Sequence, residues 1–163
     1  MKKDEIKQQL DKVVVNVGLG RLSQQANFSD KILPDAVAEL SAITGQKPLF
    51  APAKKSIAGF KIREGNIVGL KCTLRGNRMM QFLNKFVNVA LPRVRDFRGI
   101  SKDSVDEGGS LTIGLKEHIV FPEISAETSK VAFGLEITVV PKEKRRDKAM
   151  ELYAKIGIPF KKQ

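Results

Sequence analysis

The chain has 163 residues with 42% hydrophobic content, and its formal net charge at pH 7 is +11. This length suits one domain with its own core, and this hydrophobic content excludes a disordered basic tail. One cysteine and one histidine exclude an intramolecular disulfide and a Cys/His metal site, so we expect neither a metal nor a cofactor.

Strand and helix patterns alternate in the first half of the chain. Residues 13–19 (VVVNVGL) alternate with period 2, which predicts a strand. Residues 31–44 carry apolar side chains at helical spacing, and Gly45 is placed to end this helix. We predict a short strand near residues 49–50 and a longer one over 67–75 (IVGLKCTLR).

The second half of the chain repeats this alternation. Residues 78–91 are apolar at helical spacing, which predicts a helix with Pro92 at its end. Residues 111–115 and 133–140 alternate with period 2 and predict two more strands. A final helix is expected from about residue 142 to residue 156.

This pattern predicts an α+β fold with a single domain. Strictly alternating strands are typical of a mostly antiparallel sheet with helices packed on one face, here with an extended basic loop. We assign residues 1–11 to a short N-terminal segment and residues 12–163 to the domain. The other face of the sheet would stay free, as in a sheet-type RNA platform. This free face is expected to carry Asn16, Lys71, Thr73 and Arg75.

Most of the net charge lies between Lys47 and Arg98. This segment holds twelve lysines and arginines against two acids, Glu64 and Asp96, so it carries +10 of the total of +11. Such a concentrated positive field predicts a polyanionic partner, and nucleic acid is the first candidate.

The loop at residues 54–65 carries four of these bases and one acid, with Gly59 and Phe60 near its middle. One interpretation is a solvated turn whose lysines keep the protein soluble. The other is a mobile basic finger that reaches a phosphate backbone, in which Gly59 gives backbone freedom and Phe60 stacks on a base.

A second basic connection follows the helix that ends near Pro92. It reads RVRDFRG (93–99) and sets three arginines against one local acid. Because the planar guanidinium suits phosphates and base edges, this composition favours an external anion over ion pairs within the protein.

No catalytic constellation is indicated by the sequence. His118 has Glu117 beside it, but adjacent residues of a strand point to opposite faces, so we expect a structural or surface histidine. Cys72 alternates with leucines, and we expect a buried thiol. The sequence GLG at 18–20 lacks the third glycine of a dinucleotide fingerprint, and the chain contains no P-loop sequence.

Two alternatives from other functional classes stay open at this point. A nucleic-acid-processing enzyme would need a carboxylate cluster or a base beside a nucleophile, and the basic segment offers only Glu64 and Asp96. A free-standing single-strand binder would need more exposed aromatic side chains than 6% aromatic content without tryptophan readily supplies.

Several longer strings of this sequence occur in the same order in one known family. They are KVVVNVGLG (12–20), TGQKP (44–48), KKSIAGFKIREG (54–65), TLRG (73–76), LPRVRDFRGIS (91–101), IVFPEI (119–124) and IGIPFKK (156–162). In these strings the chain resembles bacterial large-subunit ribosomal protein five, the 5S rRNA-binding protein family of the central protuberance. The resemblance runs from about Lys12 to Lys162.

The resemblance implies a structural, non-enzymatic protein of the large ribosomal subunit that helps to attach 5S rRNA in the central protuberance. Its implied partners are 5S rRNA, 23S rRNA, P-site tRNA and small-subunit ribosomal protein thirteen, the last of them in an intersubunit bridge. The implied location is the ribosome in the cytoplasm. The sequence agrees with it, since no apolar run approaches the roughly 20 residues of a membrane span and no signal-peptide pattern is present.

The resemblance also implies where these partners bind. It assigns Asn16, Gln46 and Thr73 to 5S rRNA, and we expect the neighbouring bases Lys47, Lys71 and Arg75 in the same site because of their charge. From their composition we expect Arg93, Arg95 and Arg98 to contact rRNA backbone. The implied tRNA-facing loop uses Lys55, Ser56, Gly59, Phe60, Lys61 and Arg63. The segment 103–116 would face the small subunit.

The chain departs from the family pattern in three places. About a dozen residues precede the first strand, where family members usually have a helix and an extended segment. Residues 105–111 read VDEGGSL where FDGRGNY is usual, and Ala51 stands where a hydroxyl residue is usual. The second difference bears on the implied contact with the small subunit, and the third removes one polar contact.

Overall fold

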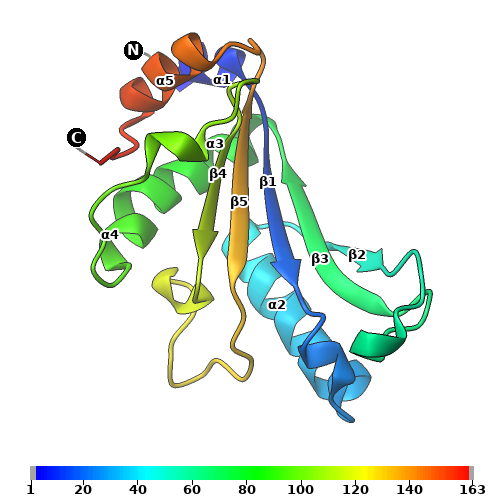
Figure 1. Ribbon diagram of the computed structural model, residues 1–163. Helices are drawn as coiled ribbons and strands as arrows, with labels where there is room; N and C mark the ends of the chain where they lie inside the picture. Colours follow the sequence, from blue (N-terminus) through cyan, green and yellow to red (C-terminus); the bar gives the residue numbers. More distant parts are fainter. Residues whose placement is uncertain (1–2, 162–163) are drawn as a thin grey trace.

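Five strands form one antiparallel sheet in the computed structural model, which describes residues 3–161. The strand order across the sheet is β2-β3-β1-β5-β4, so β1 is the central strand (Figure 1). The strands are β1 (Leu10–Gly18), β2 (Leu49–Pro52), β3 (Ile67–Leu74), β4 (Leu111–Leu115) and β5 (Leu135–Pro141).

The two long helices α2 and α3 lie on the same side of this sheet, behind it in Figure 1, whereas α1 and α5 lie together at its upper end. The predicted α+β fold with helices on one face is therefore confirmed. No helix within residues 3–161 has the length and apolar character needed to cross a membrane. The helices are α1 (Lys3–Gln9), α2 (Leu33–Thr44), α3 (Gly76–Lys85), α4 (Leu91–Arg93) and α5 (Arg146–Ile156).

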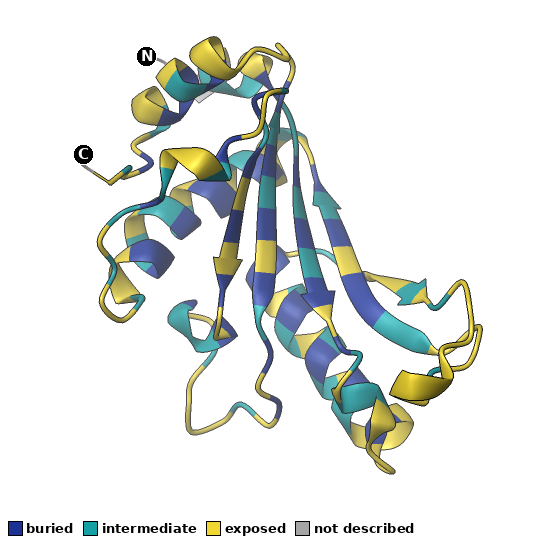
Figure 2. Ribbon diagram, in the orientation of Figure 1, coloured by how far each residue is buried: buried dark blue, intermediate teal, exposed yellow. Residues whose placement is uncertain are grey.

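Burial alternates along β1 as the sequence predicts. Val13, Val15 and Val17 are at most 2% exposed and face the helices, whereas Asn16 between them is only half-buried. Antiparallel pairing brings Val15 opposite Cys72 of β3 and opposite a buried isoleucine of β5, which continues the apolar layer across three strands. Figure 2 shows the resulting bands of buried and exposed residues along the strands.

Element boundaries differ from the predicted ones at both ends of the chain. β1 begins at Leu10, because this leucine is buried and pairs with Pro141 of β5. Helix α1 therefore precedes the strand directly and occupies most of the segment predicted as residues 1–11. Helix α5 begins at Arg146, later than predicted, because β5 continues to Pro141 and a turn follows it.

Tyr153 of α5 anchors the loop that leads into β4. Its side chain is fully buried, and its hydroxyl lies 2.6 Å from the carbonyl oxygen of Gly109 and 3.0 Å from that of Val139. Burial raises the pKa of Tyr153, so the hydroxyl keeps its proton and serves as the donor. Gly109 has φ +79°, and a Cβ there would lie 2.8 Å from the Cβ of Ala149, so the loop needs glycine at this point.

We predict that Tyr153→Phe lowers the free energy of unfolding by about 1–3 kcal/mol, because two buried carbonyl groups lose their shared donor. Urea denaturation followed by circular dichroism measures this change. Thr112→Val serves as the control, since it removes a hydroxyl from an exposed threonine pair and should alter stability by less than about 0.5 kcal/mol. Equal stability of Tyr153→Phe and the wild type would contradict the anchoring role.

Candidate nucleic-acid interface

The sheet face opposite α2 and α3, which we call the open face, brings three predicted site residues together. Asn16 of β1 pairs with Lys71 of β3, and Thr73 follows two residues further along β3 on the same face. Lys71 is exposed, whereas Asn16 and Thr73 are half-buried. This grouping follows from period-2 alternation in two strands that are neighbours in the sheet.

The centre of the open face is close to electrically neutral. In one row across the sheet, Asn16 of β1 lies between Lys71 of β3 and Glu136 of β5. In the next row, Val14 of β1 lies between Thr73 and Thr138. The face therefore offers hydroxyl, amide and carboxylate groups rather than a dense field of bases. Such groups position or read a ligand by hydrogen bonds more than by net charge.

Gln46 and Lys47 lie at the β3 side of the open face, just after α2. The Gln46 side-chain nitrogen donates to the carbonyl oxygen of Thr73 at 3.3 Å, and its oxygen accepts from Arg78 at 3.4 Å. Lys47 is exposed beside them. The structure thus places Gln46 next to Thr73, and it adds Arg78, which the sequence did not single out as a site residue.

Arg75 differs from its predicted place on a strand of the free face. β3 ends at Leu74, and Arg75 occupies the N-cap position of α3 without a side-chain hydrogen bond to the helix. Its guanidinium donates to the Asp11 carboxylate at 2.5 Å and to the Asp11 carbonyl oxygen at 3.2 Å. Part of its charge is therefore balanced within the protein.

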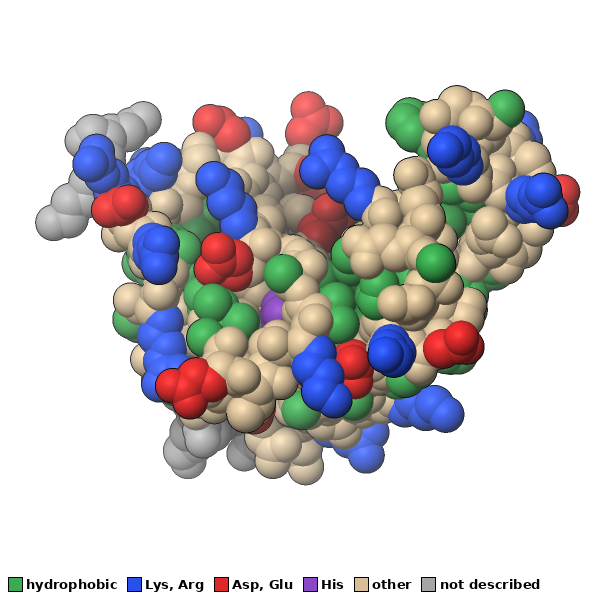
Figure 3. All heavy atoms as spheres, turned by 90° about the horizontal axis from the view of Figure 1, so that it is seen from below, with side chains coloured by type: hydrophobic (Ala, Val, Ile, Leu, Met, Phe, Trp, Pro, Cys, Tyr) green, Lys and Arg blue, Asp and Glu red, His purple; other side chains and the backbone are tan. Residues whose placement is uncertain are grey.

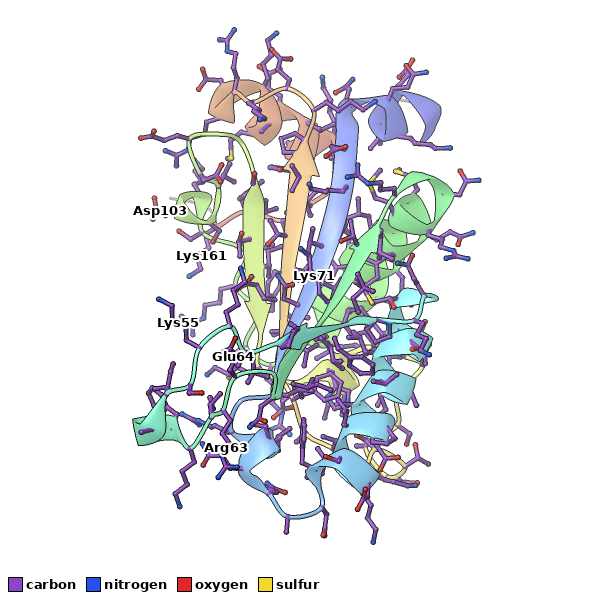
Figure 4. The ribbon with its side chains drawn as sticks, turned by 90° about the vertical axis from the view of Figure 1, so that its right-hand side faces the viewer. Lys55, Arg63, Glu64, Lys71, Asp103 and Lys161 are labelled. Atoms are coloured by element: carbon purple, nitrogen blue, oxygen red, sulfur yellow. The ribbon has the colours of Figure 1, made fainter. Side chains whose placement is uncertain are left out.

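Residues 53–66 form a projecting hairpin, which we call the finger. Its base is closed by the hydrogen bonds from Ala53 to Asn66 and from Gly65 to Ala53, at 2.8 and 2.9 Å. Ile57 and Ile62 pair near the tip. In Figure 4 the finger, with Lys55 and Arg63 labelled, projects to the side of the sheet away from α2 and α3. It therefore stands on the side of the open face.

The bases of the finger that the sequence predicts as site residues are all exposed, namely Lys55, Lys61 and Arg63. Phe60 is 63% exposed, and its carbonyl oxygen accepts a hydrogen bond of 2.8 Å from Gln24 in the segment after β1. Ser56 accepts a hydrogen bond of 2.9 Å from the Glu64 amide across the hairpin.

Contrary to the prediction, the turn at the finger tip does not require the backbone freedom of Gly59. Gly59 has no left-handed φ, and a Cβ at this position would meet nothing within 4 Å. Lys61 is the residue with a left-handed backbone, at φ 52°. The conformational freedom of Gly59 is therefore not what shapes the tip.

The large apolar side chains that stay exposed gather in β2 and the finger. They are Leu49 (70% exposed), Phe50 (48%), Ile57 (47%) and Phe60 (63%). These side chains lie among exposed lysines and arginines rather than on an uncharged surface. Apolar and aromatic groups within a basic surface are typical of nucleic-acid binding.

A hollow of about 590 Å³ lies on the open face near the ends of β1, β3 and β5. Figure 3 looks up at the lower end of the molecule in Figure 1 and shows the surface hollowed between the finger, at the upper right, and the rest of the molecule. The residues that line the hollow include Asn16, Lys71, Glu136, Gly18, Gly69 and Gly134. A Cβ at Gly69 would lie 2.9 Å from the Val17 carbonyl oxygen, so the fold itself requires this glycine.

Arg93 is the last residue of α4, Arg95 and Arg98 lie on the connection that follows it, and all three are exposed. Arg93 and Arg95 line a second hollow of about 550 Å³ together with Leu115 and Lys116 at the end of β4. Because β4 and β2 form opposite edges of the sheet, this arginine cluster is separate from the finger beside β2. The basic segment therefore divides into distinct surfaces.

One lysine of the basic segment, residues 47–98, stabilises the fold. Lys85 donates to the carbonyl oxygen of Ile43 at 2.7 Å and forms an ion pair with Glu123. Its side chain is only 22% exposed, and its ammonium group lies 5.8 Å from the centre of the Phe121 ring. Lys85 thus stabilises the contact between α2, α3 and the β4–β5 connection.

His118 is a structural residue, as predicted. It is 1% exposed, its Nε2 lies 2.5 Å from Glu39 of α2, and its Nδ1 lies 3.2 Å from the Phe133 carbonyl oxygen. Ser129 also contacts Nε2 at 3.2 Å, so no ring nitrogen faces a substrate. The ring fastens the β4–β5 connection to α2.

Cys72 is also buried, as predicted, at 1% exposure. Its sulfur lies 3.5 Å from the Thr44 hydroxyl, and burial raises the pKa of this thiol, which disfavours a reactive thiolate. Within residues 3–161, no three His, Cys, Asp or Glu side chains come together in a way that would hold a metal ion.

Two protein-family models match nearly the whole chain. Residues 7–63 match the model described as ribosomal protein L5, and residues 67–160 match the model that describes the C-terminus of the same ribosomal family. The second match alone covers more than half of the chain.

Proteins named large ribosomal subunit protein uL5 are similar over most of their length. The protein from Carboxydothermus hydrogenoformans is 48% identical over 151 residues, which is 93% of this chain and 82% of that protein. The Halothermothrix orenii protein is 50% identical over the same shares. The Oceanobacillus iheyensis protein is 50% identical over 153 residues, which is 94% of this chain and 83% of that protein.

Proposed function

This chain belongs to the ribosomal protein L5 family, and on that premise we propose that it binds 5S rRNA and helps to attach it in the central protuberance. It is a structural, non-enzymatic constituent of the large ribosomal subunit. Ribosomal RNA is accordingly its partner, and its place is the ribosome in the cytoplasm. The identity of the RNA and of the other partners is the proposal.

The observation that carries the 5S rRNA proposal is the open face. Asn16 and Lys71 are direct neighbours across β1 and β3, Thr73 lies on the same face, and Gln46 is hydrogen-bonded to the backbone of Thr73. The resemblance assigns the polar residues of this set to 5S rRNA. Their side chains lie on a sheet face that no helix of residues 3–161 covers, which is how sheet-type RNA-binding modules present their contacts.

The finger is proposed to contact P-site tRNA. It projects from the sheet, it is basic through Lys55, Lys61 and Arg63, and it exposes the ring of Phe60. Such a surface suits a structured RNA, because lysine and arginine neutralise phosphates and an aromatic ring stacks on a nucleotide. Because backbone hydrogen bonds close the hairpin where the finger leaves the sheet, the contacts of the finger are separable from those of the sheet.

The remaining two surfaces complete the proposal. Arg93, Arg95 and Arg98 are proposed to contact rRNA backbone, 23S rRNA included, at the β4 edge, where their guanidinium groups suit phosphate. The segment 103–116 is proposed to face small-subunit ribosomal protein thirteen. It contains the loop that Tyr153 anchors to α5, so that loop is presented in a fixed position.

We predict selective and salt-dependent binding to 5S rRNA. With about 6–10 phosphate contacts, the affinity should fall by about 10³–10⁵ between 50 and 200 mM salt, because each neutralised phosphate releases counterions. Filter binding across this salt range measures the effect. An unrelated folded RNA of equal length is the control. Salt-independent affinity would contradict the electrostatic part, and equal affinity for both RNAs would contradict the specific part.

We also predict that the sheet and the finger have separate roles. Asn16→Ala or Thr73→Ala should weaken 5S rRNA binding by about tenfold, because each removes a polar contact on the open face. The double variant Lys61→Ala with Arg63→Ala should keep that affinity within about threefold and instead impair tRNA binding to reconstituted ribosomes. Loss of 5S rRNA binding as large in the finger variant as in the sheet variants would contradict this division.

A further inference from the structure

Glu136 is an acid at the centre of the surface proposed to bind RNA. It lies on β5 directly opposite Asn16, and the pairs of β1 and β3 continue this row to Lys71. Glu136 is exposed and lines the hollow on the open face. A carboxylate repels phosphate, so its presence here needs an account other than electrostatic attraction.

The hydrogen bond between Glu136 and Asn16 has a defined direction. The side-chain nitrogen of Asn16 lies 3.3 Å from a carboxylate oxygen of Glu136. An ionised carboxylate only accepts hydrogen bonds, so the amide nitrogen of Asn16, and not its oxygen, must face Glu136. The amide oxygen of Asn16 therefore points away from Glu136 and is available to a ligand.

The charge of Glu136 is not neutralised within the described part of the chain. None of the ion pairs among residues 3–161 includes it, although Lys71 lies in the same row on the far side of Asn16. Asn16 and Glu136 together thus present several unoccupied acceptor positions side by side. An acceptor-rich pair of this kind matches a ligand that offers hydrogen-bond donors.

We propose that Asn16 and Glu136 form an acceptor site that reads hydrogen-bond donors of the bound RNA, namely base amino groups or ribose 2′-hydroxyls. This inference rests on the proposed binding of 5S rRNA to the open face. Phosphates offer no donors, so they are placed beside this pair, against Lys71 and Lys47. Glu136 then determines specificity, because an RNA in the wrong register brings phosphate or base acceptors against its carboxylate.

The test is Glu136→Gln, which keeps the size of the side chain and removes its charge. Removing an acid from an RNA-binding surface should, on charge alone, strengthen binding to every RNA. If Glu136 reads donors, the variant instead binds 5S rRNA more weakly by roughly 5- to 150-fold, the range for one good pair of base contacts. Its affinity for an unrelated RNA of equal length stays the same or rises.

Glu64→Gln is the matched control, because Glu64 is an exposed acid on the finger and is not part of the row of Glu136, Asn16 and Lys71. It should change the affinity for both RNAs equally and in the favourable direction. Thermal unfolding of both variants verifies that they fold. If the wild type does not prefer 5S rRNA, the proposed function fails. If the wild type prefers it and Glu136→Gln binds it as tightly or more tightly, the acceptor site is refuted.

Interference mapping distinguishes the two sources of donors. 5S rRNA carrying random 2′-deoxy or inosine substitutions is selected for binding to the wild type and to Glu136→Ala. We expect positions where one of these substitutions weakens binding to the wild type and no longer weakens binding to the variant. A 2′-deoxy position indicates a ribose hydroxyl, and an inosine position indicates the amino group of guanine. Identical interference patterns for both proteins would overturn the proposal.

Discussion

The interface depends on the one-sided burial of the central strand β1. Val13, Val15 and Val17 are held in the core between the sheet and the helices. Because side chains alternate along a strand, this burial fixes Asn16 on the opposite face, and a shift of one residue would reverse every side chain. Pairing on both sides of β1 then brings Lys71 and Glu136 next to Asn16. Core packing and the binding surface are thus two consequences of one alternation.

Charge and hydrogen bonding are separated in space on this scaffold. Exposed lysines and arginines gather on the finger and on the end of α4 with the connection after it, at opposite edges of the sheet. The centre of the open face instead carries amide, hydroxyl and carboxylate groups. Long-range attraction to RNA belongs to the edges, since it needs only charge. Register belongs to the centre, since hydrogen bonds require matched geometry.

The alternation of single strands was enough to predict that Asn16, Lys71 and Thr73 share a face, and helical spacing was enough to predict the main helices. Contacts between residues far apart in the sequence were not predictable. From the sequence, Lys85 is one of the bases of the basic segment, and only the structure shows its ion pair with Glu123. Arg75 is predicted as a strand residue, and only the structure shows its ion pair with Asp11. The acceptor site requires the register of β5 against β1, which no local pattern specifies.

Nuclear magnetic resonance of the ¹⁵N-labelled protein, titrated with 5S rRNA, tests the central claim most directly. The account predicts that the largest changes of backbone amide signals fall on the open face, at Asn16, Lys71, Thr73 and Glu136. Amides on the outer surface of α2, such as that of exposed Ala42, should change little. Large changes on α2 and α3, with an unchanged open face, would contradict the account.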